Sequence, residues 1–172
     1  MRIRFLAAPC MIAVIAIGMH FAAAAASPRD DEQAIRALQG RVAAAVSARD
    51  LDAVMKEYIP GDELFVFDSD LPRQHRGWDA FKQDWGEFIA VTKDARYEVK
   101  DLGVTVVGDA AFSHHLADIS WTARKNGLHH EQLMSMTDGY RKVGGKWLIV
   151  LEHFSVPVVD GKAVFVAWPK SD

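Results

Sequence analysis

Four side chains in this sequence are of types that can transfer protons or orient a ligand: Asp68, His115, Asp138 and His153. A carboxylate becomes an effective general base when burial raises its pKa toward the working pH, and an imidazole titrates in that range unaided. Asp68 belongs to the run Asp68-Ser-Asp70, which is also typical of a turn cap. A general base and a turn-capping aspartate are therefore both open at this position.

A predicted hairpin brings His115 and Asp138 together. Asn126-Gly127 is a strong signal for a two-residue turn, and such a turn sets His115 directly opposite Asp138. Opposite residues of an antiparallel pair share one face of the sheet. Two interpretations of the pair are open, namely a proton shuttle and a buried ion pair that only stabilises the fold.

A second predicted hairpin, turning at Gly144-Gly145, extends the same face and sets His153 beside Met136. His153 should then point inward, either to contact a ligand or as a hydrogen-bonded core histidine. The apolar part of the inward face consists of Ala117, Ile119, Trp121, Met134, Met136, Ile149 and Leu151. The opposite face carries Asp118, Glu131, Arg141 and Glu152, together with Leu116, Leu133, Leu148 and Val150.

An apolar wall with a few convergent polar groups is what a small-molecule pocket needs. We expect its walls to include Trp85, Trp121, Met134 and Met136, with His115 and His153 as ligand contacts. The prediction depends on register, because a slip of one residue would invert the face.

The first half of the chain predicts the helices that position these strands. Ser27-Pro28 followed by acidic residues is a helix start, and apolar residues recur at three- and four-residue steps through Arg49. Asp50 begins a short second helix, and Leu64 to Phe67 is typical of a buried strand. A third helix follows Gly77, and its aromatic stripe consists of Trp78, Phe81, Trp85, Phe88 and Ile89.

From Arg96 onward, extended runs separated by tight-turn dipeptides predict an antiparallel meander; the dipeptides are Gly108-Asp109, Asn126-Gly127 and Gly144-Gly145. Helices first and hairpins afterward predict an α+β fold. A twisted sheet must bury one face, so a cone-shaped, curved antiparallel sheet should wrap around the N-terminal helices.

The first 26 residues have the composition of a secretory signal peptide. Arg2 and Arg4 precede an apolar run from Phe5 to Phe21, and alanines continue to Ala26. We expect cleavage near Ala26 and a periplasmic or secreted protein that leaves the membrane, the alternative being a retained anchor. The mature chain would contain no cysteine and therefore no disulfide.

Composition and motifs exclude several function classes. Without Arg2 and Arg4, 18 of the 20 basic side chains remain against 23 acidic ones, a formal charge of −5 with no basic cluster, so nucleic acid is not an expected partner. No phosphate-binding glycine loop occurs, and we expect no cofactor. His114-His115 and His129-His130 do not predict a metal site, because adjacent strand residues point to opposite faces.

Three stretches of the chain carry a family resemblance: Ala48-Arg-Asp-Leu-Asp-Ala-Val54, then Leu64-Phe-Val-Phe-Asp-Ser69 with Arg76-Gly-Trp78, and finally Thr137 to Trp147 continuing through Glu152-His-Phe-Ser-Val-Pro157. Together they resemble a SnoaL-like domain of the nuclear transport factor 2-like superfamily, close to the ketosteroid isomerases. The resemblance covers about Asp31 to Pro157. It implies a cystatin-like α+β roll, and dimerisation through the sheet is common among such proteins.

In the isomerases a carboxylate on the first strand is the general base, while a protonated aspartate and a tyrosine stabilise the dienolate. The resemblance places the base at Asp68 and the second aspartate at Asp138. Val42 stands at the tyrosine's position and cannot donate a hydrogen bond, so the steroid reaction itself does not carry over.

The sequence therefore supports two hypotheses about the function of this protein. The first is an exported binder of a small apolar molecule in a conical pocket, with acid–base catalysis of isomerase or cyclase type as a further step; Asp68 is the base, and Asp138 and His153 are polar anchors. The second is a noncatalytic dimerisation or protein-binding module that associates through Leu133, Leu148 and Val150. We expect the domain to span residues 27–157.

The tail, residues 158–172, is predicted to be an extension with a turn at Asp160-Gly161. It could form an edge hairpin, a lid or an interface.

Overall fold

The computed structural model describes residues 27–69, 72–159 and 162–163. The predicted signal peptide and most of the predicted C-terminal extension lie outside these residues. Within them, no helix combines the length and apolar character that crossing a membrane requires.

Three helices precede most of the sheet: α1 (Pro28–Ala48), α2 (Leu51–Met55) and α3 (Trp78–Val91). Ser27 caps α1 as predicted, since its hydroxyl accepts the Asp30 backbone N–H at 3.2 Å and the Asp30 carboxylate accepts the Ser27 backbone N–H at 3.0 Å. α3 begins after Gly77, whose φ of 86° favours glycine. The predicted helices are therefore confirmed.

The strands are β1 (Phe65–Phe67), β2 (Gln74–Arg76), β3 (Thr92–Val107), β4 (Ala110–Ala123), β5 (His129–Val143) and β6 (Lys146–Ser155). They form one sheet in the order β2-β1-β6-β5-β4-β3, in which β1 runs parallel to β6. The α+β class is confirmed, although the sheet is mixed rather than wholly antiparallel. The short strands β7 (Val158–Val159) and β8 (Lys162–Ala163) form a separate antiparallel pair.

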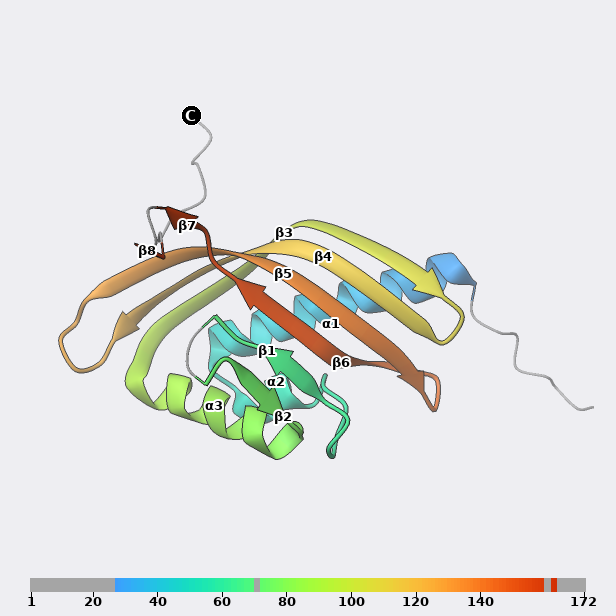
Figure 1. Cartoon of the computed structure of the whole chain (residues 1–172), viewed down its shortest axis with the longest axis horizontal. Coiled ribbons are helices and arrows are strands. Elements are labelled where there is room, and N and C mark those ends of the chain that lie inside the picture. The colour runs from blue at the N-terminus through green and yellow to red at the C-terminus, as the bar shows by residue number, and fades with distance from the viewer. Residues whose placement is uncertain (1–26, 70–71, 160–161, 164–172) are drawn as a thin grey trace, which may run out of the picture.

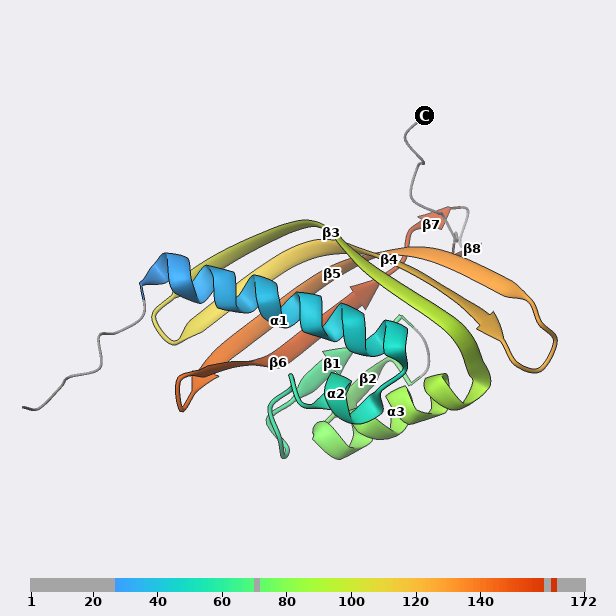
Figure 2. The ribbon, with the colours of Figure 1, turned by 180° about the vertical axis from the view of Figure 1, so that it is seen from behind.

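The long strands β3 to β6 arch over the helices (Figure 1). Seen from behind, α1 crosses the inside of the arch and α3 lies at its open side (Figure 2). The inward stripe of α1, which includes Ile35, Leu38, Val42 and Val46, is almost fully buried against the inner face of the sheet. This packing removes the apolar stripe from water and bends the sheet around it.

The β4–β5 hairpin differs from its predicted register. Ala123 pairs with Leu128 through a 2.8 Å backbone hydrogen bond, so Asn126-Gly127 closes a four-residue loop rather than forming a two-residue turn. His115 consequently lies opposite Met136, and Asp138 lies opposite Ser113. Because the shift is two residues, every side chain keeps its predicted face.

The β5–β6 hairpin turns at Gly144-Gly145 as predicted. At a bulge, the pairing of the two strands then shifts by one residue between the pair formed by Tyr140 and the pair formed by Gly139. Beyond it Asp138 pairs with Glu152 instead of Leu151. Glu152 is therefore buried inside, whereas Leu151 and His153 are exposed outside. The predicted inward orientation of Leu151 and His153 is wrong, because one extra residue inverts a strand's faces.

Candidate functional site

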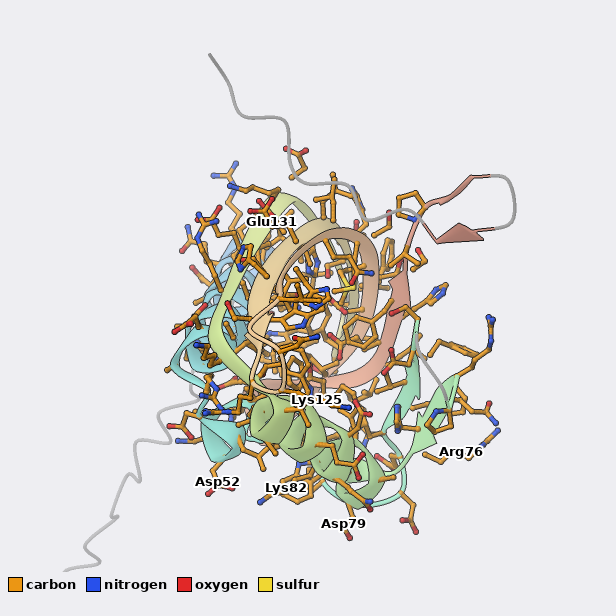
Figure 3. All side chains as sticks on the ribbon, turned by 90° about the vertical axis from the view of Figure 1, so that its left-hand side faces the viewer. Asp52, Arg76, Asp79, Lys82, Lys125 and Glu131 are labelled. Atoms are coloured by element: carbon orange, nitrogen blue, oxygen red, sulfur yellow. The ribbon has the colours of Figure 1, made fainter. Side chains whose placement is uncertain are left out.

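A cleft of about 480 Å³ opens between α3 and the inner face of the sheet. In Figure 3 the sheet curls over α3, and side chains of both lie between them. The label of Lys125 marks the β4–β5 loop, which lies next to that helix. The cleft is lined by Asp68, Ser69, Phe81, Asp84, Trp85, Glu87, Phe88, Val91, Thr92, Ile119, Trp121, Gln132, Met134 and Phe154.

Five aromatic side chains form a continuous wall along the cleft. In the order Phe154, Phe81, Trp85, Phe88 and Trp121, successive ring centroids lie 5.7–6.4 Å apart and successive ring planes are turned by 45–86°. Three of these contacts are edge-to-face and the one between Phe81 and Phe154 is tilted; such contacts hold the rings in place. Small-molecule sites in general use apolar area of this kind for affinity.

Three predicted wall residues, Trp85, Trp121 and Met134, border this cleft. The fourth, Met136, is 2% exposed and lies in the core behind it. His153 does not reach the cleft at all, because its ring lies on the outer surface beside Phe67, with the centroids 5.6 Å apart.

The polar end of the cleft brings together side chains from three elements. Asp68 follows β1, His75 lies in β2, and Asp84 lies in α3. The buried His75 Nε2 is 3.3 Å from Asp68 Oδ2 and 3.7 Å from Asp84 Oδ1. A carboxylate in contact with an imidazole can accept a proton and pass it on, with the second carboxylate compensating the imidazolium charge.

The donor atoms of Asp68, His75 and Asp84 all lie within 4.8 Å of one another. Two carboxylates and an imidazole are also donors that a divalent cation accepts, so this is the set among the described residues that a metal could use. His75 carries no signal in the sequence, because it stands in a short polar strand, Gln74–Arg76. Asp84 had a signal: it lies on the same helical stripe as Phe81, Trp85 and Phe88, where a carboxylate is unexpected.

The predicted catalytic residue Asp138 does not border the cleft; it is the centre of a buried hydrogen-bond network. Its Oδ2 accepts hydrogen bonds from Gln39 Nε2 at 2.8 Å, Ser113 Oγ at 3.0 Å and the Tyr140 hydroxyl at 3.0 Å. Burial raises the pKa of Asp138 to about 6, while the hydrogen bonds from Ser113 and Tyr140 act against that rise. Three donors hold one oxygen of Asp138 in the core, while its Oδ1 is buried without a hydrogen-bond partner among the described residues.

His115 lies next to this network without forming a charged pair. Its Nδ1 is 3.5 Å from Asp138 Oδ2, and its Nε2 is 3.4 Å from the Tyr97 hydroxyl. Burial, and then the charge of the neighbouring His114, lower the pKa of His115 to about 4, so the ring is neutral at pH 7. A neutral ring does not favour the buried ion pair, one of the two interpretations of His115 and Asp138.

Glu152 is a buried acid that the predicted register placed outside. Its Oε2 accepts a 2.7 Å hydrogen bond from the Tyr58 hydroxyl. Burial is the main cause that raises the pKa of Glu152 well above its usual range; Asp138 and Asp68 raise it further, and the Tyr58 hydrogen bond opposes them. Glu152 pairs with Asp138 of β5 on one side and with Val66 of β1 on the other, so it lies between the Asp138 network and the strand that leads to Asp68.

The raised pKa of Glu152 predicts that the Glu152→Gln substitution stabilises the protein by an amount that depends on pH. The folded state binds this proton more tightly than the unfolded chain, so the contribution of Glu152 to stability is complete below the ordinary pKa of 4.5 and is lost as pH rises toward the folded pKa. Glutamine resembles the protonated acid and does not titrate. We expect the variant to match wild type in free energy of unfolding near pH 4.5 and to be clearly more stable at pH 8, measured by urea unfolding at both pH values.

The titration of His115 occurs in both proteins and cancels in this comparison. A difference between variant and wild type that stays constant from pH 4.5 to pH 8 would contradict the assignment.

Fold and cleft together define a class of protein: an α+β roll with a cleft at its open side. Residues 35–159 match the family model of the SnoaL-like domain. The chain belongs to this SnoaL-like family, within the nuclear transport factor 2-like superfamily. No curated protein matches it.

Solved structures share the fold. A nuclear transport factor 2-like protein of unknown function from Pseudomonas putida is 29% identical, with a TM-score of 0.69 over 81% of this chain and 96% of its own. A candidate dehydratase from Streptomyces avermitilis is 17% identical, with a TM-score of 0.69 over 77% of this chain and 99% of its own. A candidate calcium/calmodulin-dependent protein kinase II association domain from Xanthomonas campestris is 22% identical, with a TM-score of 0.65 over 82% and 99%.

Proposed function

We propose that this protein is exported, binds a small, mainly apolar molecule in the cleft, and acts on it by acid–base chemistry without a cofactor. One observation carries the proposal: an aromatic-walled cleft of about 480 Å³ ends at the carboxylate of Asp68 and its imidazole partner, His75. Small-molecule sites typically enclose about 300–1,000 Å³ and combine apolar walls with a few polar groups.

In this reaction Asp68 takes a proton from the bound molecule, in an isomerase- or cyclase-type step. Asp68 lines the cleft and its side chain is 16% exposed, so the carboxylate is reachable yet partly shielded from water. His75 lies behind it and holds the carboxylate in place. Gln132, on the sheet side of the cleft, offers an amide to a polar atom of the substrate.

Native mass spectrometry of the full-length gene product, isolated from its own host, tests export and binding together. We expect a chain that begins near Ser27 and carries a small molecule, which denaturation then releases for identification. An intact, empty chain that still begins at Met1 would contradict both parts.

The aromatic wall predicts a specific binding defect. Phe88 connects the rings of Trp85 and Trp121, so Phe88→Ala should weaken binding of the released molecule about tenfold through lost contact area. Titration monitored by tryptophan fluorescence measures the change. Phe112→Ala is the matched control, because Phe112 is 51% exposed on the outer face; equal affinities of the two variants would argue against this cleft.

The second candidate function is association through the outer face of the sheet. Leu133, Leu148 and Val150 lie there on neighbouring strands and are only half-buried in one chain. We propose a homodimer joined through this patch, and the same native spectrum reports its mass. A monomer at micromolar concentration would count against the dimer and leave the cleft proposal untouched.

A further inference from the structure

In the part of the chain that the structure describes, the ionisable side chains that line the cleft are acidic. Asp68, Asp84 and Glu87 border it, and no lysine or arginine does so among the described residues. α3 accounts for much of this asymmetry, since Asp84 and Glu87 face the cleft while the one lysine of the helix, Lys82, projects from the far side (Figure 3). Lys82 Nζ there lies 2.8 Å from Asp52 Oδ1 and 4.9 Å from the centroid of the Trp78 ring.

A low-dielectric wall with charges of one sign concentrates the potential in the cleft and attracts the opposite charge.

The aromatic wall also favours a positively charged ligand. The faces of Trp, Tyr and Phe rings attract a cation whose charge lies within about 6 Å of the ring centroid. Phe88 and Trp121 are the two rings of the wall that are not buried, and both line the cleft, so these two can present their surface to a ligand. A bare metal ion would use the carboxylates but leave this wall unused.

We propose, building on the binding function proposed above, that the ligand of this cleft is an organic cation: a protonated or quaternary amine attached to an apolar body. The amine lies between the carboxylates of Asp84 and Glu87 and the rings of Trp85, Phe88 and Trp121. The apolar body extends along the wall toward Phe154. Anionic molecules of the same shape are excluded by the three carboxylates.

The test compares three small probes that share an aromatic ring: benzyltrimethylammonium, its neutral isostere neopentylbenzene, and the anion benzoate. Each is titrated into the mature protein at pH 7, low salt and with EDTA present, and binding is followed by tryptophan fluorescence. We expect the cation to bind about tenfold more tightly than the neutral isostere, and benzoate to be the weakest.

The charge requirement is tested with a double variant. Asp84→Asn with Glu87→Gln should remove most of the preference for the cation over the isostere. Asp118→Asn with Glu131→Gln is the matched control, because it makes the same change in net charge at two side chains predicted on the outer face and absent from the cleft lining. This control should keep the preference.

Equal binding of cation and isostere by the wild-type protein would overturn the cation proposal while leaving apolar binding intact. A preference that survives in the Asp84/Glu87 double variant would overturn it too, since the selectivity would then arise elsewhere. Absence of binding by every probe, together with an empty native spectrum, would overturn this proposal and the proposed function at once.

Discussion

The Asp68→Asn variant is expected to convert the molecule recovered from the cleft about 100- to 10,000-fold more slowly than the wild-type protein. Asparagine has nearly the same shape as aspartate but cannot accept the proton that the reaction removes. The contact with His75, 3.3 Å away in the wild type, would then join an amide to an imidazole, and no base would remain at that atom. Product formation at saturating substrate, followed by mass spectrometry, measures kcat directly.

Two controls separate catalysis from folding and binding. The melting temperature of Asp68→Asn should stay within a few degrees of wild type, because the side chain lies at the cleft surface. His75→Gln should reduce kcat less than Asp68→Asn and should shift its pH profile, since His75 acts through Asp68. Full turnover by Asp68→Asn would remove Asp68 from the reaction and leave a binding protein.

The second large effect concerns stability, and it comes from Asp138→Leu. Leucine fills the space but leaves the side chains of Gln39, Ser113 and Tyr140 without their shared acceptor in the core. Each unsatisfied buried donor costs roughly 1–3 kcal/mol, although these three can still bond partly to one another. We expect the free energy of unfolding to fall by about 3–5 kcal/mol, measured by urea denaturation at pH 7.

Asp138→Asn is the matched comparison for this network. Its amide oxygen keeps an acceptor for the three donors, so its stability should lie within about 1 kcal/mol of wild type. If the leucine and asparagine variants proved equally stable, the network would not be what holds this part of the core together.

Much of the fold follows from local chemistry. The Ser27 cap, the glycine that opens α3 and the turns at Gly108-Asp109 and Gly144-Gly145 each depend on a few neighbouring residues. Such signals act within one turn of helix or one hairpin, so they can be read from a short stretch of chain. They were sufficient to predict the α+β roll.

The faces of β6 could not be predicted in the same way. A bulge between Gly139 and Tyr140 has no strong local signal, yet it turns Glu152 inward and His153 outward. What supports the inward Glu152 is its hydrogen bond to Tyr58, 94 positions away in the chain. The alternation of apolar and polar residues along a strand does not reveal an inserted residue. The bulge becomes evident only when the partner strands and helices are in place.

The sequence by itself therefore determined the class of this protein, its helices, two of its three tight turns, and the presence of Asp68 and an aromatic stripe at one cleft. Only the tertiary structure decided which polar groups meet there, because Asp68, His75 and Asp84 belong to three elements whose convergence depends on how α3 packs under the sheet. It also put Asp138 into a buried hydrogen-bond network outside the cleft lining, and His153 on the outer surface. Local propensities act over a few residues, whereas a site is assembled by packing between segments far apart in the chain.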